Sequence, residues 1–223
     1  MRMPVRSARR ALFALALLAA PLAPAAAQQP ELYGPQPPPG SAFVRFVNAT
    51  GSDLAIRPDF LPAETLGTAP MARVTAYRTV ESVANRALAV EVRAGQATAR
   101  ASLRANPGTF VTVLVTAAPG GAITAQTVQD GGDGNQSRAR LAFYNAAPDC
   151  PAGGLSLDGG ASIFSDVAPG ASKTRGVNPA SASLVASCGT RRTAAFPLSG
   201  LEAGGRYSIW MMPGATPAAF VTR

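Results

Sequence analysis

Two copies of one strand plan follow each other in this sequence, and that repetition restricts the fold more than any other feature. The segment AFVRFVNAT returns as RLAFYNAAP, with its phenylalanine, asparagine and alanine 97 residues further on. LRANPGTFVTV returns as LEAGGRYSIW, which aligns Phe110 with Tyr207 at the same offset of 97. Between these matches, Gly95 pairs with Gly189 at an offset of 94, as loops of different length allow. Matches at both ends in the same order indicate an internal duplication.

Within each copy, apolar and polar residues alternate with the period of a β-strand. LAVEVRAG (88–95) places leucine and valines on one face and alanine, glutamate and arginine on the other, and ATARASLR (97–104) alternates likewise. FVTVLVT and RYSIWMM are rich in β-branched and aromatic residues and lead into glycine and proline turns. The stretch 71–87 is ambiguous and has room for a helical turn. The predicted fold class is all-β, with two tandem antiparallel β-sandwich domains of six or seven short strands each.

A polar, glycine-rich segment separates the two copies. It places the first β-sandwich domain at 41–129, a linker at 130–137 and the second domain at 138–223. The linker residues DGGDGN also raise the alternative of a calcium loop. Asp130 and Asp133 are three apart, however, and the segment lacks a closing glutamate and oxygens at alternate positions. A flexible linker is therefore the favoured interpretation.

The first 27 residues have the pattern of a signal peptide. A head with four arginines precedes the apolar run ALFALALLAA, and three alanines at 25–27 suit cleavage near Gln28. An uncleaved membrane anchor is the alternative, but a spanning helix needs about 20 apolar residues. We therefore expect an exported chain that is not an integral membrane protein after cleavage. Without those four arginines, the 20 basic residues become 16 against 12 acidic ones, a net charge of +4. That mild basicity does not indicate nucleic acid as a partner.

Cys150 and Cys188 are the only cysteines of the sequence. In an exported chain, an even pair predicts a disulfide, here inside the second domain. We expect it to join the loop after that domain's first strand to a strand in the middle of the domain. Half of a metal site is the rival interpretation, but the chain has no histidine and no further cysteine to complete one. No metal and no cofactor is predicted.

Motifs for covalent or acid–base catalysis are missing from this sequence. With no histidine, a serine–histidine–acid triad is impossible, and neither G-x-S-x-G nor S-x-x-K occurs. The 12 acidic residues are scattered, so a pair of distant carboxylates for glycoside cleavage stays open, but nothing singles one out. We therefore predict no catalytic residue and a protein that is not an enzyme.

Two kinds of side chain are candidates for binding a polysaccharide. Tyr207 and Trp210 fall on opposite faces of one strand, so one fills the core while the other is free to stack on a sugar ring. Arg93, Arg100 and Arg104 lie on polar strand faces and offer a basic stripe to a carboxylate-bearing polymer. The candidates are Arg93, Arg100, Arg104 and Trp210. Core packing for the tryptophan and a solvated face for the arginines are the alternatives.

The segment LYGPQPPPGSAFVRFVNAT (32–50) resembles the start of the mature alginate biosynthesis protein AlgF family. In that family an L-Y-G-P segment follows the signal peptide, and a proline-rich connector leads through G-S-A-F-V-R to an N-A turn. The same parts stand here in the same order over about 20 residues. FYNAAPD, SLDGG and GLEAGGRYSI in the second half are also similar to a domain that is widespread in exported bacterial proteins.

The resemblance implies a non-catalytic adaptor in the periplasm of a Gram-negative bacterium, required for O-acetylation of an exopolysaccharide. Its implied partners are a membrane O-acyltransferase and a separate periplasmic acetyltransferase with a serine–histidine–aspartate site, and the polymer is alginate or, as in related systems, cellulose. The alternative is a carbohydrate-binding or structural β-sandwich protein of the cell envelope.

The resemblance also gives the proline-rich leader (28–40) a role. PQPPPG favours polyproline II and a semi-rigid spacer. Such a spacer would hold Leu32 and Tyr33 away from the sandwich as candidate partner-binding residues. An ordinary disordered N-terminus is the alternative.

Overall fold

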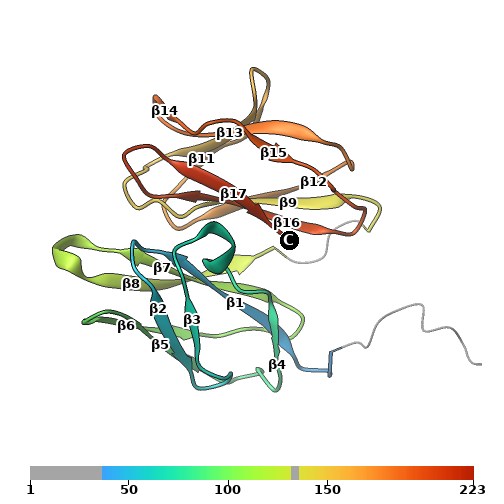
Figure 1. Cartoon of the computed structure of the whole chain (residues 1–223). Helices are drawn as coiled ribbons and strands as arrows, with labels where there is room; N and C mark the ends of the chain where they lie inside the picture. Colours follow the sequence, from blue (N-terminus) through green and yellow to red (C-terminus); the bar gives the residue numbers. More distant parts are fainter. Residues whose placement is uncertain (1–36, 132–135) are drawn as a thin grey trace, which may run out of the picture. The chain divides into compact units, whose positions relative to one another are not determined.

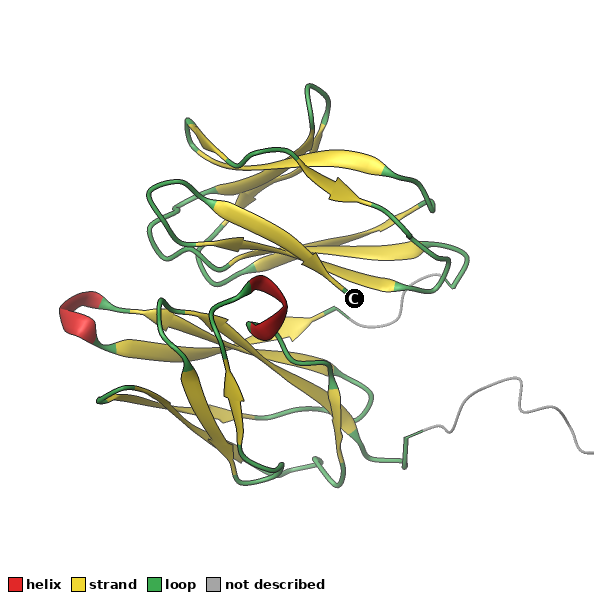
Figure 2. Ribbon diagram, in the orientation of Figure 1, coloured by secondary structure: helices red, strands yellow, loops and turns green. Residues whose placement is uncertain are grey.

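The computed structural model describes residues 37–131 and 136–223. Their regular secondary structure consists almost only of strands (Figure 1, Figure 2). Its helical elements among these residues are two 3₁₀ turns, Pro70–Ala72 and Pro119–Gly121. The first falls at the edge of the stretch whose pattern was ambiguous. The predicted all-β fold is confirmed.

Eight strands build the first sandwich. One sheet has the order β4-β1-β7-β8 and the other β3-β2-β5-β6. Their bounds are β1 Ala42–Ala49, β2 Leu54–Pro58, β3 Glu64–Leu66, β4 Arg78–Val80, β5 Leu88–Ala94, β6 Ala97–Leu103, β7 Phe110–Ala117 and β8 Ile123–Asp130. The number exceeds the predicted six or seven because β3 and β4 are only three residues long and carry too little pattern to be recognised.

Nine strands build the second sandwich. One sheet has the order β12-β9-β16-β17, and the other has β11-β10-β13-β14 with β15 also paired to β13. Their bounds are β9 Ala139–Asn145, β10 Gly153–Leu157, β11 Ser162–Val167, β12 Ser172–Val177, β13 Ala182–Cys188, β14 Arg191–Arg192, β15 Phe196–Leu198, β16 Arg206–Met212 and β17 Ala218–Thr222. Residues 37–223 cluster as one compact unit, so the division into two domains stays a prediction.

Each sandwich encloses an apolar core formed by the inward residues of its two sheets. Leu88, Val90 and Val92 of β5 are at most 1% exposed, while Ala89 and Arg93 face outward, as the alternation predicts. In the second sandwich, the inward residues of β9 and β16 meet those of β10 and β13. Burial of such side chains contributes about 1.5–3 kcal/mol each, which makes these cores the main source of stability.

One strand pair in each sandwich differs from the predicted antiparallel arrangement. β1 runs parallel to β7, and β9 runs parallel to β16, whereas the neighbouring pairs are antiparallel. Alternation of apolar residues reveals which face of a strand is buried but carries no information about the direction of its neighbour. The alternation of apolar residues therefore could not predict the two parallel pairs.

The two sandwiches share one topology, in agreement with the duplication. The sheet order β4-β1-β7-β8 corresponds to β12-β9-β16-β17. Gly95 and Gly189, aligned from the sequence, both have φ of 58° in the turn that follows an equivalent strand. The alignment of Phe110 with Tyr207 is wrong by one residue, since Val111 pairs with Val44 as Tyr207 pairs with Leu141. Aromatic identity was misleading there, because Phe110 faces away from the core.

The repeated asparagine has the same structural role in both copies. The side chains of Asn48 and Asn145 are fully buried at the ends of β1 and β9. Asn48 donates to the carbonyls of Ser52 and Gly67, at 2.8 and 2.9 Å. Asn145 donates to those of Cys150 and Val167, also at 2.8 and 2.9 Å. Each buried amide therefore binds two backbone carbonyls beyond its own strand.

Candidate functional site

A third apolar cluster joins the outer faces of two sheets, one from each sandwich. Val47 and Leu114 of the first sandwich pack with Tyr144, Trp210 and other residues of the second. The rings of Tyr144 and Trp210 stack with centroids 4.0 Å apart, and the indole N–H donates to Thr222 Oγ1 at 2.9 Å. Residues that alternation assigns to outward faces are therefore buried, because the second copy covers them.

An arginine and an aspartate are buried beside this cluster. Arg45 of β1 is 3% exposed and Asp130, the last residue of β8, is 7% exposed. Arg45 Nε donates to Thr112 Oγ1 at 2.8 Å, and its two terminal nitrogens donate to Ser208 Oγ at 2.9 Å and Tyr144 Oη at 2.8 Å. The guanidinium of the first sandwich thus binds two hydroxyls of the second.

The carboxylate of Asp130 accepts hydrogen bonds from three hydroxyl groups. Tyr144 donates to Oδ1 at 2.6 Å, while Thr112 and Tyr77 donate to Oδ2 at 2.6 and 2.8 Å. Thr112 and Tyr144 each accept a hydrogen bond from Arg45 and donate one to Asp130, so their hydroxyls connect the guanidinium to the carboxylate. We call Arg45, Asp130 and their four hydroxyl partners, Tyr77, Thr112, Tyr144 and Ser208, the buried polar network. Such a network stabilises only when its members are satisfied.

Aromatic rings complete the surroundings of the guanidinium. Arg45 Cζ lies 4.3 Å from the ring centroid of Tyr77 and 4.6 Å from that of Trp210, distances typical of cation–π contacts. Burial is the largest cause that raises the pKa of Tyr77 and of Tyr144 above the ordinary value, and the nearby Arg45 opposes it. Both phenols are therefore neutral donors at physiological pH. A cavity of about 20 Å³ beside Tyr77, Asp130 and Ser208 has room for one water.

Sequence reasoning missed this network for two separate reasons. Arg45 occupies an outward position of its strand, where an arginine normally indicates solvent. Asp130 was placed in the linker and weighed as a calcium ligand, but it belongs to β8, so the first sandwich extends one residue beyond the predicted boundary. The duplication offered one signal. Ala142 occupies in the second copy the position of Arg45 in the first, so the two copies differ in charge at one equivalent position.

Two of the three predicted arginines, Arg93 and Arg100, lie together on the outer face of the sheet β3-β2-β5-β6. Arg57, Glu91 and Arg100 occupy one row across β2, β5 and β6. Glu91 accepts from Arg93 Nε at 3.1 Å and from Arg100 Nη2 at 3.0 Å, and Arg100, followed by Arg93, lowers the pKa of this carboxyl. Arg93 and Arg100 have side chains that are 51% and 81% exposed.

Sequence reasoning did not include Arg57, which becomes part of this set only through the strand register. Arg104 follows β6 and is exposed. We call this set, Arg57, Glu91, Arg93, Arg100 and Arg104, the arginine face.

The other sequence-predicted site residues do not join the arginine face. Trp210 is 0% exposed, so the expectation that its ring is free to stack on a sugar is wrong. Tyr207, on the opposite face of β16, is 5% exposed, and its hydroxyl donates to the carbonyl of Gly200 at 2.7 Å. Leu32 and Tyr33, like the signal peptide, lie outside the described residues.

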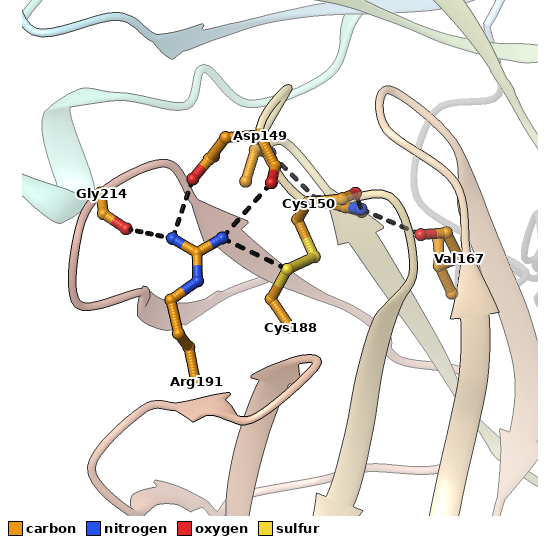
Figure 3. The surroundings of a disulfide bond; sticks show 8 residues. Asp149, Cys150, Val167, Cys188, Arg191 and Gly214 are labelled. Carbon is orange, nitrogen blue, oxygen red and sulfur yellow. Dashed lines mark hydrogen bonds and ion pairs between the residues drawn. A yellow bond between two sulfur atoms is a disulfide. The ribbon is translucent and has the colours of Figure 1, made fainter.

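Cys150 and Cys188 form the predicted disulfide (Figure 3). It links the loop after β9 to the last residue of β13, as expected. Arg191 lies beside the bond: its Nη1 donates to Asp149 Oδ2 at 2.9 Å and to the carbonyl of Gly214 at 3.0 Å, and its Nη2 lies 3.4 Å from Cys188 Sγ. Both cysteines are at most 6% exposed. Such a bond is typical of oxidising compartments.

None of the helices in residues 37–131 and 136–223 is long and apolar enough to cross a membrane. No protein-family model and no curated protein matches the sequence. Among solved structures, the chain is similar to the family CBM26 module CBMbc of Eubacterium rectale Amy13K in complex with maltoheptaose. The identity is 8% and the TM-score 0.28, over 82% of this chain and 97% of that chain.

Proposed function

We propose that this chain is an exported, non-catalytic adaptor that binds an anionic exopolysaccharide in the periplasm and serves its O-acetylation. The observation that carries the proposal is the arginine face. Arg57, Arg93 and Arg100 flank Glu91 on the outside of a four-stranded sheet, and the exposed Arg104 follows β6. Guanidinium groups bind carboxylates with paired, charge-assisted hydrogen bonds, so a polymer of uronate residues suits this surface.

The spacing of the arginine face suits a repeating ligand. Neighbouring strands lie about 4.8 Å apart, so Arg57 and Arg100, two strands apart in one row, are separated by about 10 Å at the backbone. Glu91 between them accepts from two arginines and stands where a ligand carboxylate would bind. A regular polyanion can bind both flanking arginines at once, which raises its affinity over that of a single carboxylate.

In this proposal, other proteins transfer the acetyl group. The sequence has no histidine, so the triad of a periplasmic acetyltransferase has to come from a partner. In this proposal a membrane O-acyltransferase supplies acetyl groups, a separate acetyltransferase places them, and Leu32 and Tyr33 of the leader contact one of the two. The resemblance of residues 32–50 to the alginate biosynthesis protein AlgF family supports these partners.

Deletion of the gene in its own host tests the adaptor role. We expect acetyl esters to disappear from the secreted polymer while polymer yield is unchanged, with recovery on complementation. Unchanged acetylation in a host without a second copy of the gene would refute the role. Loss of the polymer itself would instead favour a structural part in the cell envelope.

Binding assays test the arginine face directly. Polymannuronate should bind with an affinity that falls as salt rises, and the triple variant Arg57→Met, Arg93→Met, Arg100→Met should bind at least tenfold more weakly. The matched control removes three exposed arginines of the second sandwich, Arg175, Arg192 and Arg223. Equal losses in both variants would show that net charge, and not this face, determines binding.

Glu91→Gln distinguishes an anionic from a neutral polymer. For a polyanion, removal of the resident carboxylate frees Arg93 and Arg100, so affinity should rise several-fold. Weaker binding in this variant would mean that Glu91 accepts hydrogen bonds from sugar hydroxyls. That outcome would favour the second candidate function, a module for neutral carbohydrate.

A further inference from the structure

The outer face of the second sandwich has a depression at the position that corresponds to the arginine face. Its volume is about 410 Å³, within the range of ligand-binding clefts. Because the sheets are equivalent, Gly154 takes the place of Ala55, and Ser187 the place of Arg93. Its polar lining consists of serine hydroxyls and one carboxylate; with the glycine at its floor, these residues are Gly154, Ser156, Ser162, Ser165, Asp166 and Ser187. We call it the hydroxyl groove.

Two irregularities of the edge strand β11 shape this groove. The pairing of β10 with β11 shifts register on both sides of Leu155, so β11 bulges twice within a few residues. At the first shift, Ser165 and Asp166 together stand opposite Gly154. Bulges re-aim side chains and are enriched next to binding sites.

Asp166 has a backbone conformation that side chains rarely adopt. Its φ is 54°, in the left-handed region, and it is one of three non-glycine residues with positive φ in the described part of the chain. Such conformations concentrate at functional sites. The conformation belongs to the same bulge that lines the groove.

Gly154 keeps the floor of the groove low. A Cβ at this position would lie 2.9 Å from Ser187 Oγ and 3.6 Å from the carbonyl of Phe164. Any side chain there would turn the serine away and fill the depression. The glycine therefore preserves both the space and the hydroxyl beside it.

We propose that the hydroxyl groove binds a neutral sugar through its vicinal hydroxyls. An exposed carboxylate accepts two hydrogen bonds from adjacent hydroxyls, and serines both donate and accept. No basic side chain is among the residues that line the groove, and Asp166 would repel an anion. The ligand thus differs in class from the anionic polymer proposed for the arginine face, and either site can exist without the other.

Amide chemical-shift titration of the full mature chain with cellohexaose and with mannohexaose tests the proposal. Shifts should be confined to residues around the hydroxyl groove. Asp166→Asn should weaken binding about tenfold, as loss of a charged acceptor does, while asparagine still tolerates the left-handed conformation. Gly154→Ala, which moves Ser187, should weaken binding by a similar factor. Asp158→Asn, at an exposed aspartate outside the groove, should have no effect.

Three results would overturn the proposal. The first is the absence of groove shifts with both neutral hexasaccharides, and the second is unchanged affinity in Asp166→Asn and Gly154→Ala. The third is stronger binding of a hexauronate than of the neutral sugars at this groove, which would assign it to anions. Failure here would leave the arginine face unaffected, since Arg57→Met, Arg93→Met, Arg100→Met is measured with a different ligand.

Discussion

Individual residues of the buried polar network should be far more sensitive to substitution than surface arginines. Arg45→Met removes the positive charge that is connected to Asp130 through the hydroxyls of Thr112 and Tyr144. Asp130 then stays buried without an opposite charge, so we expect a loss of about 3 kcal/mol in the free energy of unfolding. Denaturant unfolding measures it. Arg104→Met, at an exposed position, is the control and should change stability by less than about 0.5 kcal/mol. Similar losses in both variants would show that the network contributes little.

Asp130→Asn in combination with Arg45→Met tests whether the two charges act together. Because they share Thr112 and Tyr144, the double variant should lose less stability than the sum of the single losses. Additive losses would mean that the two charged groups are stabilised independently of each other.

The two phenols of the network predict an alkaline transition. Burial raises the pKa of Tyr77 and Tyr144 above that of an unfolded tyrosine, about 10. Below that pH both phenols are protonated in either state, and their contribution to stability is fully present. As the pH rises further, the unfolded chain loses protons that the folded protein retains, so stability falls.

Tyrosinate absorbance and circular dichroism, followed together, measure this transition. The phenols of Tyr77 and Tyr144 should ionise only as the protein unfolds. Tyr77→Phe should make the fall in stability with pH shallower. Tyrosinate from both residues in a still folded protein would contradict the assignment.

At the level of secondary-structure elements, the disulfide is the strongest local constraint. It closes a loop with a sequence separation of 38, and replacement of both cysteines by alanine should cost about 3–4 kcal/mol in the chain-entropy model. Thermal unfolding of the double variant measures this loss. Because both cysteines are buried, the native protein should resist mild reductants, and rapid reduction without unfolding would contradict their burial.

Strand positions and the disulfide were predictable because both depend on local pattern or residue identity. β5, β6, β7 and β16 lie where alternation and β-branched residues placed them. The arginines of β5 and β6 were found for the same reason, since polar faces of a strand can be read directly.

What covers an outward face could not be predicted. Arg45 and Ser208 are 163 residues apart, and nothing near either residue in the sequence signals their contact. Trp210 was misplaced for the same reason. The hydroxyl groove depends on two bulges in β11, and nothing in the sequence SIFSDV of this strand signals them.

For the whole molecule, the shared cluster and the network predict cooperative unfolding. Residues 37–223 form one compact unit, and Trp210 is fully buried in the cluster that joins the sandwiches. Calorimetry should therefore show a single transition. Trp210→Ala should cost about 3–5 kcal/mol and split that transition in two, because each sandwich retains its own core. Two transitions in the unmodified protein would show that the sandwiches unfold independently.

The unequal pair Arg45 and Ala142 has a consequence for how such a chain can evolve. Ala142 stands in the second copy where Arg45 stands in the first, and Arg45 binds Ser208, the strand neighbour of Ala142, so the copies are no longer interchangeable. A gene that lost its second copy would expose a guanidinium and an apolar strand face, and one that lost its first would expose Trp210. Two first copies facing each other would bring two arginines together without the hydroxyls of Tyr144 and Ser208. Substitutions on the outer surfaces are therefore tolerated in evolution. Loss of either copy is not, so the duplication has become irreversible.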